Sequence, residues 1–435
     1  MKINSIKLNH WIEPEFIAHL LAARFGEKGL SWLDSNGKQN AEYSFLGVNP
    51  KTIISSNKDN SDNPFEKLAQ IDQGFWMGWL SYEAGSWIEP NNSWRESEMA
   101  TLWIASYDPI IKFNILKKEI IIEGTNLNDI KEYKKLIDEI NIQKIKDGLN
   151  KNLIFDFSKL NLDKKCEKFR ENVFKIKKLI NQGDIFQANL TTKVDIETSA
   201  EYKYLDIYSK IRKKLKAPFG GVIIGNIDGE KEGVLSTSPE RFLKTNHAGY
   251  VETRPIKGTR PRNTDEKMDA LNAIDLITNE KDRAENIMIV DLLRNDLGKV
   301  CETGSIVVTE LLKLESYPKV HHLTSVIRGK IQKKKNWIDI LKACWPGGSI
   351  TGAPKVRACQ RIYELEGFDR GPYCGSFLKL DWEGELDSNI LIRSFIIKKK
   401  KIKVFAGCGI VNDSIPSKEN EELNWKLLPL IDSLK

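Results

Sequence analysis

The amino-acid sequence predicts an α+β protein, with layered antiparallel β-sheets flanked by helices. Two observations support this fold class. Strand-like segments are more numerous than a doubly wound parallel sheet needs, and many follow one another along the chain without an intervening helix. The chain has 435 residues, of which 40% are hydrophobic, so it can bury a substantial core in two or more domains or in one unusually large one.

The first part of the chain mixes short strand-like segments with turns. Residues 75–85 alternate aromatic and small side chains, which predicts a half-buried strand. Residues 112–124 predict two strands that are joined by a turn at Lys117 and Lys118.

A polar region follows at residues 125–163 and predicts a helix and a connection. This region is the best candidate for a domain boundary. We therefore expect an N-terminal region over residues 1–150 and a second region over residues 151–435.

From residue 162 onward the pattern becomes more regular. Residues 166–184 predict an amphipathic helix, because Phe169, Val173, Ile176 and Ile180 recur at helical spacing and Gly183 ends the pattern. Further strands are predicted at residues 185–194, 220–227, 233–239, 376–382, 389–398 and 401–407. Further helices are predicted at residues 264–278, 280–297, 353–366 and 418–434.

Composition excludes some classes of function. The 67 basic and 60 acidic side chains give a net charge of +7, and the lysine runs are not interleaved with aromatic residues, so solvated lysines are favoured over a nucleic-acid surface. No segment approaches the ~18 apolar residues of a membrane span, and residues 1–16 lack the apolar core of a secretory signal. Six cysteines occur without CxxC spacing, which is typical of reduced thiols. We expect a cytoplasmic protein with neither nucleic acid nor membrane as a partner.

The segment WPGGSITGAPK, residues 345–355, is a glycine-rich loop before a predicted helix. It is not a phosphate-binding P-loop, because Ala353 stands where that motif requires lysine. Ser and Thr side chains in the loop are available to cap the helix, and free backbone N–H groups there suit a carboxylate or a phosphate. Anion binding and a purely structural cap are both compatible with these residues.

Two predicted helices each carry a pair of carboxylates three residues apart. Asp282 and Glu285 form the first pair, and Glu419 and Glu422 form the second. This spacing places each pair on one helix face. Two such faces across a cleft could hold Mg²⁺, which prefers oxygen ligands, although solvated acidic pairs have the same spacing.

Three further side chains are candidates for chemistry. Arg393 lies in an otherwise apolar predicted strand, where it either pairs with a buried acid or binds an anionic ligand. His322 is either a general acid or base or a hydrogen-bonded core histidine. Glu240 follows a proline at the end of a predicted strand, where it is either a presented acid or a structural residue.

Together these segments resemble the chorismate-utilising enzymes, which include anthranilate, aminodeoxychorismate, isochorismate and salicylate synthases. The matching segments appear in the family's order between residues 183 and 426. They are GDIFQANLTT, SPERF, TRPIKGTRPR, DRAENIMIVDLLRNDLG, HHLTS, PGGSITGAPKVRA, LIRS, AGCGIVNDS and ENEELNWK. The resemblance implies a large chorismate-binding α+β fold, with residues 151–435 as the catalytic region and residues 1–150 matching more loosely. It implies that chorismate binds with Mg²⁺ in a deep cleft.

The resemblance also assigns roles to residues of this sequence. Glu285 and Glu422 match the metal-binding glutamates, and Asp282 and Glu419 match the acidic positions beside them. His322 matches the histidine beside the reacting ring. The positions that match substrate-binding residues are Ser349, Tyr373, Arg393, Gly409 and Lys426.

Lys257 indicates which reaction of the family to expect. The anthranilate-forming enzymes resemble PIAGT at this turn, whereas this chain reads PIKGT, which is similar to the enzymes that aminate chorismate at C4. A lysine amine that attacks C2 could expel the C4 hydroxyl, after which ammonia could attack C4 and expel the lysine. Glu240 is the matching acid, and Arg254 and Arg260 are candidate cationic neighbours of Lys257. The alternative is an anthranilate-forming enzyme with a substituted turn.

Two positions depart from the C4-aminating pattern. Tyr373 stands where some of those enzymes have tryptophan and is more similar to the anthranilate type. Cys408 stands where glycine or alanine is common. Neither changes the assignment.

Partners also follow from the resemblance. The sequence contains no recognisable Cys–His–Glu glutaminase domain, so we expect it to use free ammonia, or glutamine together with a separate glutamine amidotransferase subunit. The family also has a regulatory or structural tryptophan pocket. The residues at matching positions are Ser35, Tyr43, Ser44, Phe45, Leu46, Pro218, Phe219 and Gly220.

Overall fold

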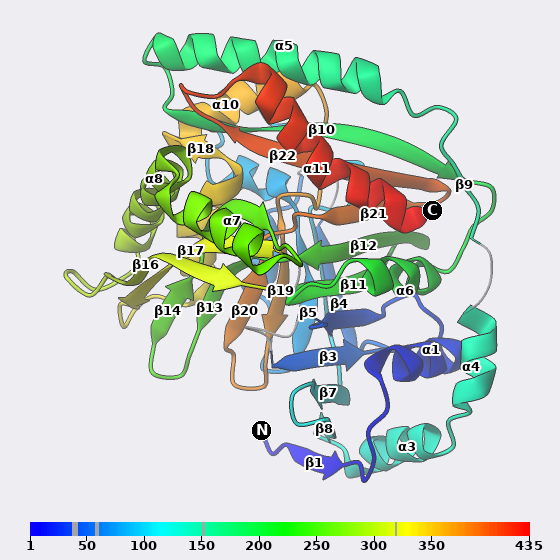
Figure 1. Ribbon diagram of the computed structural model, residues 1–435. Helices are drawn as coiled ribbons and strands as arrows, with labels where there is room; N and C mark the ends of the chain where they lie inside the picture. Colours follow the sequence, from blue (N-terminus) through cyan, green and yellow to red (C-terminus); the bar gives the residue numbers. More distant parts are fainter. Residues whose placement is uncertain (37–41, 57–60, 150–152, 318–319) are drawn as a thin grey trace.

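The computed structural model describes residues 1–36, 42–56, 61–149, 153–317 and 320–435 (Figure 1). These residues form two large antiparallel sheets with helices packed on them, which confirms the predicted α+β class. The predicted boundary between residues 150 and 151 lies outside the described residues, so the division into two regions stays a prediction.

The first sheet joins strands from the beginning and from the end of the chain. It has twelve strands, and β9 (Phe155–Asp156) lies outside the main order, where it pairs with β10. The main order is β1 (Asn4–Lys7), β8 (Glu119–Gly124), β7 (Ile110–Asn114), β3 (Tyr43–Gly47), β2 (Ser31–Asp34), β11 (Phe219–Ile227), β12 (Glu230–Ser238), β21 (Ser394–Lys398), β22 (Lys401–Ile410), β10 (Gln187–Thr198) and β18 (Gly352–Ala353).

The second sheet is also built from distant parts of the chain. It has ten strands, and β16 (Val307–Ser316) pairs with β17 outside the main order. The main order is β15 (Ile256–Pro261), β17 (Val320–Lys330), β14 (Tyr250–Thr253), β13 (Arg241–Thr245), β20 (Leu386–Asn389), β19 (Ser376–Leu380), β5 (Trp76–Leu80), β6 (Leu102–Ser106) and β4 (Thr52–Ser56).

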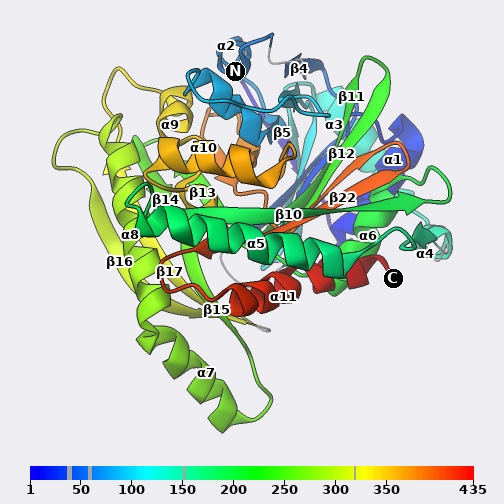
Figure 2. The ribbon, with the colours of Figure 1, turned by 90° about the horizontal axis from the view of Figure 1, so that it is seen from above.

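Helices cover the outer faces of both sheets. Viewed from above, α5 and α11 run beside β10 and β22, and α7 extends away from the body (Figure 2). The helices on the first sheet are α1 (Pro14–Phe25), α3 (Leu127–Asp138), α4 (Ile142–Leu149), α5 (Leu162–Asn181), α6 (Tyr204–Lys214), α10 (Lys355–Glu366) and α11 (Pro416–Leu434). Those on the second are α2 (Pro64–Leu68), α7 (Glu266–Thr278), α8 (Glu280–Gly298) and α9 (Trp337–Cys344).

Two apolar clusters form the core. One lies between the first sheet and its helices, and the other lies between the two sheets. In the second cluster, Ile223 and Val234 of the first sheet pack with Trp79 and Trp103 of the second, whose rings stack 5.3 Å apart. The apolar layer between the sheets holds their edges in a fixed relation, and the functional site is built at one of those edges.

The structure confirms most of the predicted elements and corrects three. The helix predicted at residues 166–184 is α5, and the two strands predicted at residues 112–124 are β7 and β8. The strand predicted at residues 75–85 ends at Leu80, because a 3₁₀ helix occupies Tyr82–Trp87. The single helix predicted in residues 125–163 is two helices, α3 and α4.

The third correction concerns residues 389–398, which were predicted as one strand. They contain the end of β20 and all of β21, separated by residues 390–393.

Finally, no helix in the described ranges combines the length and apolarity needed to cross a membrane.

Candidate functional site

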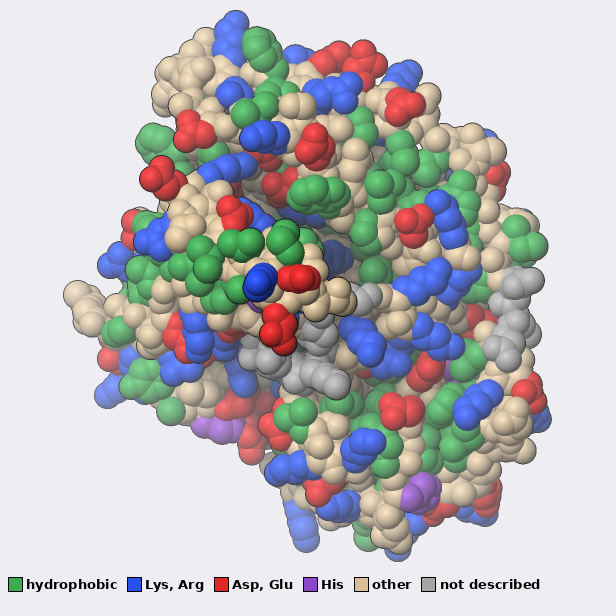
Figure 3. Space-filling view, viewed as in Figure 1, with side chains coloured by type: hydrophobic (Ala, Val, Ile, Leu, Met, Phe, Trp, Pro, Cys, Tyr) green, Lys and Arg blue, Asp and Glu red, His purple; other side chains and the backbone are tan. Residues whose placement is uncertain are grey.

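A cavity of about 680 Å³ lies where the β10–β22 edge of the first sheet approaches the β15–β17 edge of the second. Helices α8 and α11 supply its other walls, and the surface is visibly hollowed between α7 and α11 (Figure 3). Eleven of the predicted site residues line it: Glu240, Lys257, Asp282, Glu285, His322, Ser349, Tyr373, Arg393, Gly409, Glu422 and Lys426. The chain therefore brings together residues that lie up to 186 positions apart in the sequence. Glu419 is not part of the cavity wall.

Lys257 projects from strand β15 and not, as predicted, from a simple turn. Pairing between β15 and β17 shifts register between Ile256 and Thr259, and Gly258 within this irregularity has a φ of 85°. Only glycine adopts such a conformation readily, so Gly258 sets the direction of its neighbour. The Lys257 ammonium donates a hydrogen bond to the Ser349 carbonyl at 3.3 Å.

Glu240 lies in the connection between β12 and β13, and only 5% of its surface is exposed. Burial raises the pKa of its carboxyl to about 7, against the opposing effects of a hydrogen bond to Ser349 and the charge of Lys257. A carboxyl with this pKa exists in both protonation states near neutral pH. It can therefore give a proton in one step and accept one in the next.

Each of the four predicted acidic residues is paired with a cation of the chain. Glu285 lies 3.9 Å from the Lys257 ammonium, and Asp282 pairs with Arg260 at 2.9 Å. Glu422 pairs with Lys426 at 2.7 Å, and the ammonium of Lys426 lowers the pKa of the Glu422 carboxyl to about 2. Glu419 pairs with Lys281 at 2.5 Å. Lys281 was not predicted, although its position next to Asp282 on α8 was visible in the sequence.

The carboxylates on α8 and α11 suit a divalent cation that takes oxygen ligands. Burial raises the pKa of Glu285 to about 7, which shows that the nearby lysines do not fully offset its desolvation. Oε2 of the buried Glu419 has no hydrogen-bond partner among the described residues. Within that part of the chain, the ligand atoms of Cys408, Glu419 and Glu422 lie within 4.8 Å of one another. Burial raises the pKa of the Cys408 thiol, so the oxygen atoms are the ligands on offer.

His322 is buried in strand β17 and hydrogen-bonded. Its Nδ1 lies 2.8 Å from the Thr259 hydroxyl. Burial, together with the charge of Arg393, lowers the pKa of His322 to about 3. The ring is therefore neutral at physiological pH, where it can donate or accept a hydrogen bond but does not serve as an imidazolium acid.

Arg393 lies in the irregular segment between β20 and β21, with a φ of 51°. Its carbonyl accepts a hydrogen bond from the Thr237 N–H, which fixes the backbone. The guanidinium makes no ion pair with another residue in the described ranges, and burial lowers its pKa. A half-buried cation without a counter-ion, on the wall of a cavity, is an anion-binding group.

The loop before α10 is held differently from the prediction. No Ser or Thr side chain caps the helix, because its N-cap is Pro354. The Thr351 hydroxyl instead donates to the Gly347 carbonyl within the loop. Sequence patterns also gave no indication of Arg370, whose buried guanidinium donates to the carbonyls of Ile350 and Asn189, both on the cavity wall.

Gly409 on β22 lets three functional groups come close together. A Cβ atom at this position would lie 2.7 Å from Gln187 Nε2, 3.1 Å from Glu285 Oε2 and 3.3 Å from Lys257 Nζ. The sequence patterns did not predict Gln187 as a site residue. It is 1% exposed, and its Oε1 has no hydrogen-bond partner among the described residues. The absence of a side chain at Gly409 thus lets the polar ends of Gln187, Glu285 and Lys257 come together.

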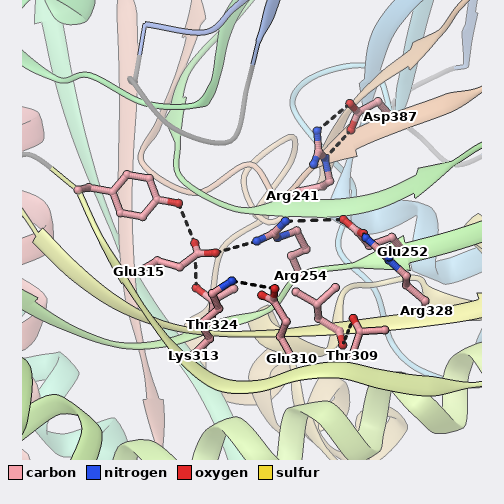
Figure 4. A network of polar contacts seen from close by, with 12 residues as sticks. Arg241, Glu252, Arg254, Thr309, Glu310, Lys313, Glu315, Thr324, Arg328 and Asp387 are labelled. Atoms are coloured by element: carbon pink, nitrogen blue, oxygen red, sulfur yellow. Dashed lines mark hydrogen bonds and ion pairs between the residues drawn. The ribbon is translucent and has the colours of Figure 1, made fainter.

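The two candidate cationic neighbours of Lys257 are placed differently. Arg254 lies between Glu315, at 2.7 Å, and Glu252, at 3.9 Å, in a polar network of the second sheet (Figure 4). It does not line the cavity. Arg260 does line it, where it pairs with Asp282.

A comparison with family models agrees with this site. The model described as "chorismate binding enzyme" matches residues 30–432. The chain belongs to the chorismate-binding enzyme family.

Relatives within the chorismate-binding enzymes include two kinds of synthase. Aminodeoxychorismate synthase component 1 of Klebsiella aerogenes is 41% identical over 271 residues, which cover 62% of this chain and 57% of that protein. Anthranilate synthase component 1 of Acetivibrio thermocellus is 31% identical, covering 95% of this chain and 92% of that one. The crystal structure of anthranilate synthase component I from Streptococcus pneumoniae has a TM-score of 0.70 at 26% identity, covering 97% of this chain and 99% of that chain.

The tryptophan pocket expected from resemblance to the chorismate-binding enzymes lies partly at a second cavity, of about 910 Å³. Five of its eight predicted residues line this cavity, namely Tyr43, Phe45, Pro218, Phe219 and Gly220. The other three, Ser35, Ser44 and Leu46, are buried outside its wall. Tryptophan binding stays a prediction.

Proposed function

We propose that this protein is aminodeoxychorismate synthase component I. It converts chorismate and ammonia to 4-amino-4-deoxychorismate, for p-aminobenzoate and folate synthesis in the cytoplasm. The observation that carries the proposal is the juxtaposition of the Lys257 amine and the buried Glu240 carboxyl, both in contact with Ser349, on the wall of one cavity.

The charges of the cavity suit the two carboxylates of chorismate. One carboxylate is taken by Arg393, with Tyr373 and Lys426 as further contacts and the backbone of Gly409 close by. The other would lie near Glu285 and Glu422, which would hold Mg²⁺ with Asp282 and Glu419 beside them. The ion would supply positive charge to offset the substrate carboxylate next to Lys257.

Two displacements then give amination at C4. The lone pair of the Lys257 amine forms a bond to C2, the two ring double bonds shift, and the C4–O bond breaks while Glu240 donates a proton to give water. Ammonia next forms a bond to C4, the double bonds shift back, and the C2–N bond to Lys257 breaks. Glu240 accepts the surplus proton of the new amine, so the enzyme returns to its initial state. The neutral ring of His322 contributes hydrogen bonding beside the reacting ring.

Ammonia reaches this site either free in solution or from a separate glutamine amidotransferase subunit. The name "component 1" of the relatives supports the second source. All six cysteines are buried and unpaired, which supports a reducing compartment such as the cytoplasm.

The second candidate is anthranilate synthase component I. Two observations favour it: relatives of that name match nearly the whole chain, and Tyr373 resembles the anthranilate type. Lys257 argues against it, because the anthranilate-forming enzymes resemble PIAGT at this position, where this chain reads PIKGT.

The product distinguishes the two candidates. We expect that chorismate, Mg²⁺ and ammonium with the purified protein give a product which aminodeoxychorismate lyase converts to p-aminobenzoate, measured by chromatography. The same mixture without lyase should show no anthranilate fluorescence. Direct formation of anthranilate would replace the proposal with the second candidate.

Gly409→Ala tests whether the close approach at β22 matters for this reaction. The added methyl group would displace Gln187 and press on Glu285 and Lys257, and misplacement of a catalytic group by about 1 Å can lower kcat on the order of 10²-fold. Overpacking should also lower stability by roughly 1–3 kcal/mol. Steady-state kinetics and thermal unfolding measure both effects. Gly148→Ala on α4, where a Cβ would meet nothing within 4 Å, is the control that should keep the kinetics of the wild type and raise stability slightly, by roughly 0.5–1 kcal/mol. An active Gly409→Ala enzyme would contradict the assigned geometry.

A further inference from the structure

The side chain of Lys281 joins the two helices that carry the acidic residues. Its ammonium lies 2.5 Å from Glu419 Oε1 on α11 and 3.9 Å from Glu285 Oε1 on its own helix α8. The side chain is 31% exposed and lines the cavity. Neither the assigned reaction steps nor the substrate contacts above use this residue.

The charges around Lys281 leave little net negative charge for an added cation. Glu285 and Asp282 on α8 face Lys257 and Arg260, and Glu422 on α11 faces Lys426. Lys281 supplies the remaining positive charge and is the only member of the described chain that contacts acids of both helices. The cluster of four carboxylates and four cations is therefore close to neutral.

We propose that Lys281 is an internal counter-ion that competes with the divalent cation for Glu285, and so makes metal binding depend on the anionic substrate. This inference rests on the proposed function, which assigns the metal to Glu285 and Glu422. A lysine can serve this purpose because its ammonium sits on a flexible four-carbon chain and can move away from Glu285 while it keeps Glu419.

The competition has a definite consequence for the order of binding. A divalent cation alone adds two positive charges to a nearly neutral cluster, so it should bind weakly. Chorismate brings two negative charges, so the cation and the substrate together restore the balance. Glu419 then anchors Lys281 through Oε1, which is consistent with the place of Glu419 outside the cavity wall.

Metal binding without turnover tests the proposal. Mn²⁺ is used as the probe, and its free concentration is followed by electron paramagnetic resonance with and without chorismate, in the absence of ammonia. For Lys281→Met we expect Mn²⁺ alone to bind at least about tenfold more tightly, because a cation within about 4 Å of the site has been removed. The gain in affinity that chorismate gives to the wild type should shrink by a similar factor.

Two controls separate charge from structure. Lys281→Arg keeps the positive charge and should bind Mn²⁺ like the wild type. Lys299→Met, which removes a 57% exposed lysine at the far end of α8, should also leave Mn²⁺ binding unchanged. If Lys281 only holds the helices together, Lys281→Met will bind Mn²⁺ equally or more weakly while its melting temperature falls, and the inference is overturned.

Failure of the proposed function gives a different result. A wild-type protein that binds no Mn²⁺ even with chorismate would remove the metal site itself, and the inference with it. Normal wild-type binding with no tightening in Lys281→Met overturns the inference alone.

Discussion

Lys257→Ala is expected to lose C4 amination by roughly 10³-fold or more, because the proposed nucleophile of the first displacement would be absent. The p-aminobenzoate formed in the presence of aminodeoxychorismate lyase measures this loss. The fold should persist, since the described contacts of the Lys257 ammonium are polar and at the cavity surface. Thermal unfolding checks this point.

Lys257→Arg separates covalent from electrostatic catalysis. Arginine keeps the positive charge near Glu285 but stays protonated and cannot act as the nucleophile. We expect Lys257→Arg to be as inactive as Lys257→Ala. Activity within about tenfold of the wild type would show that Lys257 contributes only charge, and the two-displacement mechanism would have to be abandoned.

Glu240→Gln is expected to lower the rate by about 10²–10⁴-fold, the usual contribution of a positioned acid or base. The pH profile adds a sharper test. Because the pKa of Glu240 is raised to about 7, its protonated form falls as the pH rises through 7, and departure of the C4 hydroxyl slows with it. At a fixed concentration of free NH₃, kcat of the wild type should therefore decline above pH 7. The residual activity of Glu240→Gln should not show this decline.

Glu83 provides a matched control for the pH profile. It is 2% exposed, and burial raises its pKa to about 8, but it lies outside the cavity. Glu83→Gln should keep the alkaline decline of the wild type. If the decline were lost in Glu83→Gln but kept in Glu240→Gln, the titrating carboxyl would be Glu83 and not Glu240.

Much of the fold could be predicted because local periodicity decides it. The apolar positions of α5 recur at helical spacing, and three of them, Phe169, Val173 and Ile176, are buried as expected. The break at residues 390–393 could not be predicted, because Ile390, Leu391 and Ile392 read as a continuous strand. Their backbone instead donates hydrogen bonds to the carbonyls of Glu240, just after β12, and Gly375, which are distant in sequence.

The site residues were predicted from short sequence motifs. Such motifs do not reveal contacts between residues that are distant in sequence. Eleven predicted residues meet at one cavity, but the ion pair between Lys281 and Glu419 joins positions 138 residues apart. Arg370 likewise holds Asn189 from 181 residues away. Such pairings depend on how the two sheets and their helices are stacked. A lysine beside an aspartate, or a glutamine in a strand, carries no local signal of that arrangement.

The backbone of Arg393 has a consequence for any attempt to stabilise this enzyme. Its φ of 51° belongs to a region that suits glycine or asparagine, and a larger side chain there carries on the order of 1 kcal/mol of strain. Selection for thermal stability alone would therefore favour glycine at this position. The same substitution would remove the cation assigned to the substrate carboxylate. At residue 393, higher stability would therefore come with lower affinity for the substrate.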